Sequence, residues 1–583
     1  MIWECVEIFK RELEKNSDKF VLDNYIPKDG TYFIIKIEKD NWEMMEPIDI
    51  TYDKKQERVE GEMNVYYEKV CFLDYYSKLI DMDKALDRAK KIHSNNYLSF
   101  FVKKENLFNG ALTVDIIKKY YDVFRNLNTK YGRSPESKKL YEETEKLCGQ
   151  IDIDLINSIE EWINTHIFKI LKPSKEKDYL KLFFVFPDWN KTKQLFIQEG
   201  TRYFIPNIYN NNKYNTDGHD GKILGLPNNN LQMNGKKPYL GNMSRKNKAP
   251  FLLDREQVLL QAKFYDYLEG FAAKGKYDVY FDIEKNKIRA YKSKEYPGSG
   301  FYGYYIRIKK GKEVEIQNVD VVVYYNPNLR PAFLYKQILE VKESQNYGSI
   351  AKRKDLENLI NEVFFNKGLM ANYFTEPKDI PKNDPKNDPI VFREIVEVRE
   401  RLFAWFYKNT DMDISTVLIA SAWELIKNSF KKGNWTKTKH QLNLKWSLED
   451  YFNSNQKKEI LMNEIEKNMF RYMKEQDWDF KNDEEYYFGV GQMASFLIGK
   501  SRSAKKPMSF INIYLSAGND QVIKEQLRTL FQKYSYDISY TDWRVKSLFS
   551  HLMLYRPNGK VNKEMIIAGA TASNVIYKKE EED

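Results

Sequence analysis

Two carboxylates and a lysine supply the residue types of metal-dependent nuclease chemistry. Asp320 and the triplet Glu340-Val341-Lys342 match a PD-(D/E)xK nuclease, in which a strand holds the triplet beside the first carboxylate so that both bind a metal near the scissile phosphate. Here Leu334, Ile338, Leu339 and Lys342 recur at helical spacing, which predicts a helix. A helix would not point the triplet toward the first carboxylate as a strand does. A stand-alone metal-dependent nuclease therefore stays open only as the alternative function.

The other residues that often carry catalysis show no catalytic spacing. The chain has five histidines and three cysteines, which are His93, His166, His219, His440, His551, Cys5, Cys71 and Cys148. None of the histidines has helical metal-ligand spacing, His219-Asp220 lacks the further ligands of an HD phosphohydrolase, and no CxxC pair occurs. No Walker A, GxSxG or GxGxxG motif is present either. We expect no catalytic residues, no metal and no cofactor, hence no enzyme.

Basic residues gather in residues 84–104. Lys84, Arg88 and Lys91 are spaced at i, i+4 and i+7, which predicts one cationic helix face. His93, Asn95 and Asn96 follow as donors to phosphate, and Tyr97 as a ring for stacking. A solvated helix with a polar turn explains the same pattern, so both interpretations stay open.

A second candidate is residues 206–248, a long polar segment with eleven Asn and seven Lys or Arg against Asp217 and Asp220. Irregular segments of this length are usually functional or disordered. Asparagine can read base edges in either groove. The candidate contacts are Asn228, Asn229, Asn230, Lys236, Lys237, Asn242, Arg245 and Lys246.

A third candidate is residues 427–446, with six lysines, no acids, and Phe430, Trp435 and Trp446 among them. Rings between lysines suit single-stranded nucleic acid, although tryptophans that only anchor a loop at the edge of a bundle give the same pattern. A short basic turn, residues 500–506, joins two predicted helices. The candidate contacts here are Lys431, Lys432, Trp435, Lys437, Arg502, Lys505 and Lys506.

The elements that position these patches predict an α+β fold. Strand-like runs lie at residues 31–37, 179–186, 277–283, 302–308 and 319–325, with helical patterns such as 258–268 and 356–364 between them. Residues 376–391, which contain a doubled KNDP, predict a Pro-rich linker. Apolar stripes at 461–473, 523–534 and 545–552 predict a helical bundle. We expect a mixed α/β nucleic-acid-binding and motif-sensing part over residues 1–375 and a C-terminal bundle over residues 392–583.

Bulk properties limit the class of protein. The 583 residues, 42% of them hydrophobic, provide for two or three domain cores. The net charge of +10 favours an anionic partner. The sequence shows no signal peptide and no apolar run near the length of a membrane span, and few cysteines fit a reducing compartment. We expect a cytoplasmic protein without a membrane partner.

Several segments, in this order, resemble the large subunit of the type I-B CRISPR effector complex, Cascade (the Cas-eight-b family). The N-terminal ones are Asp74-Tyr75-Tyr76-Ser77-Lys78-Leu79-Ile80, Lys84, and Lys91-Ile92-His93-Ser94-Asn95-Asn96-Tyr97. The central ones are Gly241-Asn242-Met243-Ser244-Arg245-Lys246 and Tyr265-Asp266-Tyr267-Leu268. The C-terminal ones are Tyr487-Phe488-Gly489-Val490-Gly491-Gln492, Lys533-Tyr534 and Ala568-Gly569-Ala570. The resemblance covers nearly the whole chain and rests on order and length, since none of these is a strict catalytic motif.

The resemblance implies a non-catalytic role in prokaryotic antiviral defence. The large subunit lies beside the subunit that grips the 5′ handle of the CRISPR RNA, reads the protospacer-adjacent motif in double-stranded DNA, helps open the duplex, stabilises the R-loop and recruits the helicase-nuclease. RNA–DNA pairing reads the sequence, and the protein senses only the short motif. The implied partners are CRISPR RNA, target DNA, backbone and handle-binding subunits, a small subunit and the helicase-nuclease. Some relatives carry cysteine-rich zinc elements that this chain lacks, so we expect loops such as residues 206–248 to sense the motif.

The resemblance also implies an internal start at Met462, because relatives can make their small subunit by initiation inside the large-subunit gene. Lys458-Glu459 can be encoded AAG GAG, a ribosome-binding sequence, and residues 462–583 would then form a separate small helical subunit. Codons AAA GAA and an ordinary core methionine are the alternative. Met493, preceded by Gly489-Val490, is the second candidate start.

Overall fold

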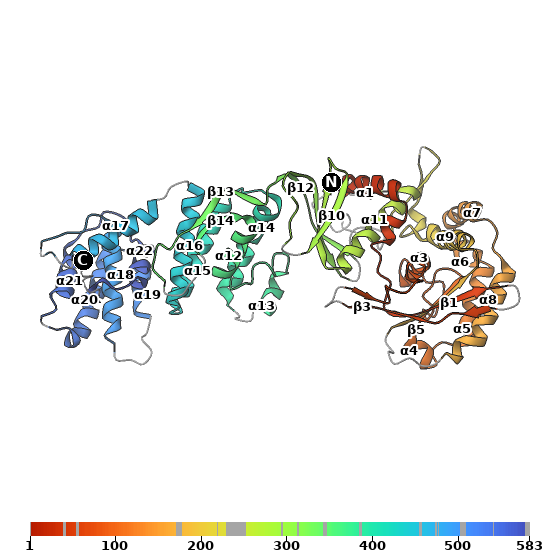
Figure 1. The fold of residues 1–583 in the computed structure, drawn as a ribbon, viewed down its shortest axis with the longest axis horizontal. Coiled ribbons are helices and arrows are strands. Elements are labelled where there is room, and N and C mark those ends of the chain that lie inside the picture. Colours follow the sequence, from red (N-terminus) through yellow and green to blue (C-terminus); the bar gives the residue numbers. More distant parts are fainter. Residues whose placement is uncertain are drawn as a thin grey trace. The chain divides into compact units, whose positions relative to one another are not determined.

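The chain folds as an α+β protein with two compact units (Figure 1). The computed structural model describes residues 2–38, 42–53, 58–170, 178–218, 220–228, 252–292, 295–311, 314–341, 347–383, 388–453, 457–472, 475, 477–501, 509–539 and 541–577. Helices make up 55% and strands 18% of the chain, and its C-terminal region is helical, which confirms the predicted fold class. Unit 1 comprises residues 1–295 and 302–323, and unit 2 comprises residues 296–301 and 324–583.

A six-stranded sheet lies at the centre of unit 1. Its strands are β1 (Gly30–Ile37), β2 (Trp42–Met44), β3 (Ile48–Asp53), β4 (Arg58–Glu60), β5 (Ser99–Lys103) and β6 (Tyr179–Val185). The order is β4-β3-β1-β6-β5, with β2 beside β1. Strands β1 and β6 are parallel, with Gly30 opposite Tyr179, and the other pairs are antiparallel.

Helices cover both faces of this sheet, as two successive residues of β6 show. The ring of Phe184 lies 5.4 Å from that of Trp162 in α8 (Ile153–His166). The ring of Phe183 lies 6.4 Å from that of Phe196 in α9 (Trp189–Asn207). Because successive side chains of a strand point to opposite faces, α8 and α9 lie on opposite sides of the sheet. Burial on both faces explains why residues 179–186 form an unbroken apolar run.

Further helices complete the cover of the sheet. They are α3 (Tyr67–Ser77), α4 (Lys104–Phe108), α5 (Val114–Arg125), α6 (Asn128–Tyr131) and α7 (Pro135–Cys148). Phe100 of β5 contacts Tyr120 of α5, with ring centroids 6.1 Å apart, and α3 packs on α9. The short strands β7 (Thr216–Asp217) and β8 (Ile223–Leu224) follow α9.

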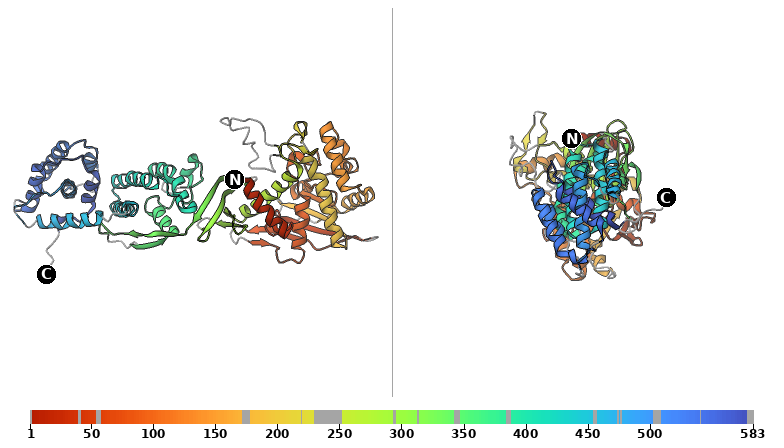
Figure 2. Two further views of the ribbon diagram at one scale, coloured as in Figure 1. Left: turned by 90° about the horizontal axis from the view of Figure 1, so that it is seen from above. Right: turned by 90° about the vertical axis from the view of Figure 1, so that its left-hand side faces the viewer.

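A second sheet of unit 1 has the strand order β10-β9-β11-β12. Its strands are β9 (Lys276–Asp282), β10 (Lys287–Lys292), β11 (Phe301–Lys310) and β12 (Val314–Tyr325). Helices α1 (Ile2–Asn16) and α11 (Arg255–Ala273) lie side by side (Figures 1 and 2) and share a core with this sheet, while α2 (Lys19–Leu22) follows α1. A capping box fixes the start of α11, because Asp254 accepts from Gln257 N at 2.9 Å and Gln257 Oε1 accepts from Asp254 N at 3.1 Å.

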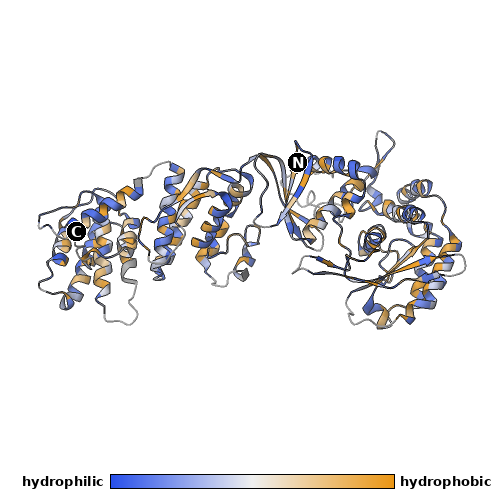
Figure 3. Cartoon of the chain, viewed as in Figure 1, coloured by the Kyte–Doolittle hydropathy of each residue, from blue (hydrophilic) through white to orange (hydrophobic). Residues whose placement is uncertain are grey.

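Unit 2 begins with a β-ribbon and continues as helices. Its elements are β13 (Asn328–Tyr335), β14 (Gly348–Lys352), α12 (Arg353–Val363), α13 (Ile380–Asn383), α14 (Pro389–Lys408), α15 (Ile414–Lys431), α16 (Trp435–Asn453), α17 (Lys457–Tyr472), α18 (Asp483–Gly499), α19 (Ser509–Ser516), α20 (Asp520–Tyr534), α21 (Trp543–Leu554) and α22 (Lys563–Thr571). Several helices of both units carry hydrophobic residues on one side and hydrophilic residues on the other (Figure 3). The three apolar stripes predicted from the sequence lie on α17, α20 and α21, and their buried residues share one core.

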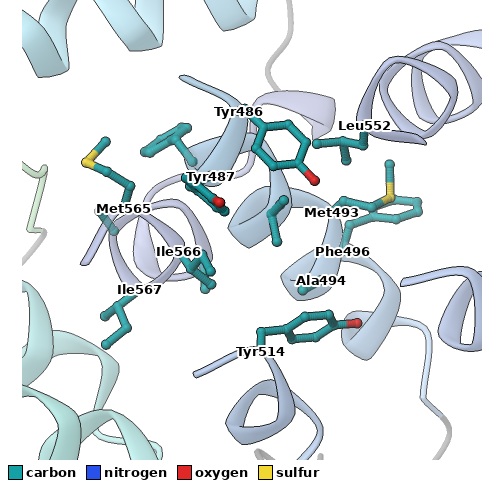
Figure 4. Close-up of a cluster of buried hydrophobic side chains, with 14 of the residues drawn as sticks. Tyr486, Tyr487, Met493, Ala494, Phe496, Tyr514, Leu552, Met565, Ile566 and Ile567 are labelled. Atoms are coloured by element: carbon teal, nitrogen blue, oxygen red, sulfur yellow. The ribbon is translucent and has the colours of Figure 1, made fainter. Parts of the chain in front are cut away.

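Helices α18 and α22 make the closest contact of this core. Met565, Ile566 and Ile567 of α22 lie beside Tyr487 of α18, and Leu552 of α21 lies on the side of Met493 (Figure 4).

The boundary between the units lies in β11 and β12 and not in the Pro-rich segment at residues 376–391. That segment belongs to unit 2, where it forms a 3-10 turn (Pro377–Asp379) and α13 and then starts α14. Asp388 caps α14, because its Oδ1 accepts from Ile390 N at 3.1 Å and Pro389 occupies the first turn. The proline therefore marks a helix start inside a unit.

The helix predicted across Leu334 to Lys342 is wrong. Residues 328–335 form β13, and residues 336–341 are irregular, while Lys342 lies outside the described residues. Side chains of α16 bond the irregular backbone, since Leu339 N donates to Asn443 Oδ1 at 2.7 Å and Lys336 N donates to Ser447 Oγ at 3.0 Å. These tertiary bonds satisfy the backbone groups that a helix would have paired.

Candidate nucleic-acid interface

Residues 81–94 of unit 1 form a loop, and the cationic helix predicted there is wrong. Lys84 ends a single 3-10 turn (Met82–Lys84), and Arg88 and Lys91 lie in irregular backbone. Asp81 accepts from Asp83 N and Lys84 N at 2.7 and 2.9 Å. Asp87, 4% exposed, accepts from Ala89 N, Lys91 N and Ile92 N at 2.8, 2.7 and 3.1 Å. Aspartate bonding to nearby backbone N–H groups competes with helix, which explains the loop.

The polar residues after this loop serve the fold. Asn95 is 2% exposed and donates to the Tyr76 and Lys78 carbonyls at 3.0 and 2.9 Å. Asn96 is 0% exposed and donates to Ser77 Oγ at 3.2 Å. Tyr97 is also buried. These side chains present nothing to a phosphate in this conformation, so Asn95 and Asn96 are corrected to structural residues.

His93 is half-buried, and its two ring nitrogens lie 3.0 Å from Tyr179 OH and 3.1 Å from the Lys90 carbonyl. Burial lowers the pKa of His93 below its ordinary value of 6.5, and the positive charges of Lys103 and Lys28 lower it further. The hydrogen bond with the Lys90 carbonyl acts in the opposite direction. The imidazole is therefore neutral near pH 7 and adds no charge to the interface.

Lys84 and Arg88 meet two cations from a different segment. Lys130 of α6 donates from Nζ to the Ala85 carbonyl, between them. Arg133 follows α6 after Gly132, and Arg88 and Arg133 are exposed. The pattern analysis missed Lys130 and Arg133; the run Lys130-Tyr131-Gly132-Arg133, with two cations around a helix-ending glycine, is the signal that could have found them.

Only part of the Asn-rich segment, residues 206–248, lies within the described residues. Pro206 and Asn207 end α9, and Asn228 is 3% exposed, with its backbone N donating to the Ile208 carbonyl at 2.6 Å. Asn228 is therefore part of the folded unit and not a surface contact. The other candidates fall outside the described residues; they are Asn229, Asn230, Lys236, Lys237, Asn242, Arg245 and Lys246.

Residues 427–446 form the end of α15, a turn at Gly433 and the first half of α16. Phe430 and Trp446 are 1% and 0% exposed, so neither is a stacking surface for a base. Trp435 is half-buried, and its ring contacts Phe430 at 5.5 Å. These rings anchor the turn to the core, which favours the packing interpretation.

The lysines of this segment mostly have partners. Lys432 pairs with Asp388 at 2.6 Å, and Lys437 donates to Asn366. Lys445 is buried between Glu449 and Glu564, 2.7 Å from each. Lys431 is exposed. In the basic turn at 500–506, Arg502, Lys505 and Lys506 fall outside the described residues.

The N-terminal and central segments that carry the family resemblance meet each other. Asp74 accepts from Lys181 Nζ and from Tyr25 OH, the latter at 2.8 Å. Asp266 accepts from Tyr75 OH and Lys78 Nζ at 2.9 and 2.7 Å. The segment 74–80 therefore links the central sheet to α11.

The C-terminal segments of the resemblance also meet. A Cβ at Gly491 would lie 2.2 Å from the Ile566 carbonyl, and one at Gly569 would lie 2.1 Å from the Phe488 carbonyl. Gln492 donates to the Gly569 carbonyl at 2.5 Å, and its Oε1 accepts from Val575 N at 2.8 Å. Glycine is needed here because the two helix backbones touch.

No group of three or more His, Cys, Asp or Glu in the described parts of the chain could hold a metal ion. His219 falls outside them. Of the helices described, none is long and apolar enough to cross a membrane. Comparisons with protein-family models, curated proteins and solved structures found no match for the chain.

Proposed function

We propose that this chain is the non-catalytic large subunit of a type I-B CRISPR RNA-guided surveillance complex. In this role it recognises the protospacer-adjacent motif in target double-stranded DNA, aids unwinding and R-loop stabilisation, and recruits the helicase-nuclease. It acts in the cytoplasm with CRISPR RNA, the backbone and handle-binding subunits and a small subunit.

One observation carries the proposal: a segment that carries the family resemblance, residues 74–97, is also where cations gather. Lys130 donates to the Ala85 carbonyl, between Lys84 and Arg88 of this segment, and Arg133 lies three residues after Lys130. Clustered cations without an equal number of carboxylates favour a polyanion, and phosphate contacts supply most of the affinity of nucleic-acid-binding proteins.

The test is reconstitution with neighbouring Cascade subunits and CRISPR RNA. The tagged chain should co-purify with short RNA and the backbone subunits, and the complex should bind target duplexes with the motif more tightly than duplexes without it. Metal-dependent DNA cleavage by the chain alone would instead support the stand-alone nuclease. Failure to bind any nucleic acid, alone or in the complex, would contradict the proposal.

The motif reader can be tested separately. Replacing Asn229, Asn230, Lys236 and Lys237 with Ala should reduce discrimination between the two duplexes and leave assembly intact, because these are the side chains proposed to contact the motif. Asn228→Ala is the contrasting variant: its buried side chain predicts a loss of stability and not of discrimination. Unchanged motif preference in the fourfold variant would show that this segment is not the reader.

A further inference from the structure

Lys130 reaches across from α6 into the loop of residues 81–94. It is half-buried, and its Nζ donates to the Ala85 carbonyl, between Lys84 and Arg88. Arg133 follows the C-terminal end of the same short helix, after Gly132, and donates a long bond, 3.4 Å, from Nε to the Thr129 carbonyl. Two segments far apart in the sequence thus bring four cations to one place.

The carboxylates of this loop are already used. Asp81 and Asp87 accept backbone N–H groups, and Asp83 pairs with Lys90 at 2.9 Å. In the described residues, Arg88 and Arg133 have no ion pair with a carboxylate. The loop and α6 region therefore keep an excess of positive charge. It carries six cations, Lys84, Arg88, Lys90, Lys91, Lys130 and Arg133, against three carboxylates, Asp81, Asp83 and Asp87.

The cations repel one another. Burial, followed by Arg133, Lys84 and Arg88, lowers the pKa of Lys130 to about 8, and only Asp87 opposes this effect. The bond from Lys130 Nζ to the Ala85 carbonyl holds Lys130 beside Lys84 and near Arg88, and an anion placed among these cations would relieve their repulsion.

We propose that Lys84, Arg88, Lys130 and Arg133 form a site for one backbone phosphate of a nucleic acid strand. The site rests on the proposed function and deepens it, because it names a contact point of the large subunit. Two exposed guanidinium groups supply paired N–H donors that match phosphate oxygens. Lys130 supplies an ammonium whose position is fixed by the Ala85 carbonyl.

Such a site couples binding to a proton. Below about pH 8, Lys130 is already charged in the free protein, so affinity does not depend on its titration. Above that pH the free Lys130 is neutral, and a phosphate that favours the ammonium must bind together with a proton. Affinity therefore falls as pH rises through the pKa of free Lys130, by at most about tenfold for each pH unit.

The first experiment removes the two exposed cations from the full chain. Binding of single-stranded RNA and of duplex DNA, each about 20 nucleotides long, is measured by fluorescence anisotropy over a series of salt concentrations. Arg88→Gln with Arg133→Gln should weaken binding about tenfold near pH 7 and lower the log–log salt slope by about 1. Lys118→Gln with Lys146→Gln removes two exposed cations from helices of the same unit and should change neither.

The second experiment tests Lys130. The wild-type chain should bind more weakly near pH 9 than near pH 7, and Lys130→Arg, which stays charged, should remove that difference.

A wild-type chain that binds nucleic acid, together with an Arg88→Gln, Arg133→Gln variant that binds equally well, would overturn the site and leave the proposed function standing. A wild-type chain that binds no nucleic acid, alone or assembled, would overturn both. If inorganic phosphate competes at micromolar concentration, the site is one for a free anion, and the nucleic-acid assignment is overturned.

Discussion

Asp74 neutralises a lysine inside the core of unit 1. Its side chain is 1% exposed and that of Lys181 is 3% exposed, and Tyr25 OH donates to the same carboxylate. Burial lowers the pKa of Lys181, while the charge and hydrogen bond of Asp74 act to raise it. Removing one member of such a pair leaves the other charge buried without compensation.

Asp74→Ala should therefore lower the free energy of unfolding of unit 1 by about 3–5 kcal/mol. Thermal and urea denaturation followed by tryptophan fluorescence would measure the change. Asp115→Ala, which breaks an exposed pair with Lys119, should cost no more than about 1 kcal/mol. Equal effects of the two variants would show that the Asp74–Lys181 pair is not held in a dry core.

Residue roles were the hardest feature to predict from the sequence. Asn95 and Asn96 have the side chains of a phosphate-binding turn, but their partners are groups of residues 76–78, brought there by the fold. Lys130 and Arg133 carry no pattern that links them to Lys84 and Arg88. Charge and polarity can be read from a sequence, whereas the partner of a polar group depends on the tertiary structure.

Helices α18 and α22 approach so closely that their backbones touch at two glycines. Gly569 faces the Phe488 carbonyl, and Gly491 faces the Ile566 carbonyl. Since both neighbours are backbone atoms, a side chain added at either glycine cannot be accommodated by a rotamer change. The helices must move apart, which disturbs the core on both sides of the contact.

Gly569→Ala should destabilise unit 2 by about 1–3 kcal/mol through overpacking, despite the higher helix propensity of alanine. Gly499→Ala, in α18, is the matched control, because nothing lies within 4 Å of the added Cβ. Differential scanning fluorimetry would compare the two variants. A Gly569→Ala protein as stable as the control would contradict the close contact between α18 and α22.

The strands and C-terminal helices that were predicted from the sequence have a local signal. The five predicted strand runs correspond to β1, β6, β9, β11 and the second half of β12, and the C-terminal stripes to α17, α20 and α21. The failures, at residues 84–91 and 334–342, lie where side chains bond the backbone. Asp87 bonds the backbone within the loop, and Asn443 bonds it from a helix distant in sequence. The periodicity of hydrophobic residues does not reveal either bond.

The two units have separate cores, and the core of unit 2 includes residues on both sides of Met462. The core of unit 2 joins α15 and α16 to α17–α22 through Phe430, Leu442 and Trp446. Glu564 of α22 ties them further, since Trp446 Nε1 donates to it and Lys445 pairs with it at 2.7 Å. A product containing only residues 462–583 would keep α18–α22 together. It would expose the part of their core that α16 covers in the full chain.

The hypothesis that translation also begins at Met462 can be sharpened by this packing. Helix α17 begins at Lys457, so such a product would lack its first turn, and Met462 itself is 1% exposed.

We expect a C-terminal fragment from a C-terminally tagged native gene, detectable by immunoblot and N-terminal sequencing. Synonymous recoding of Lys458-Glu459 with Met462→Leu should abolish it. Met469→Leu, equally buried on the same helix, makes the same packing change of less than about 1.5 kcal/mol and should leave the fragment in place. A fragment that survives recoding with its N-terminus at Met493 would move the start to α18, and no fragment from the native gene would refute internal initiation.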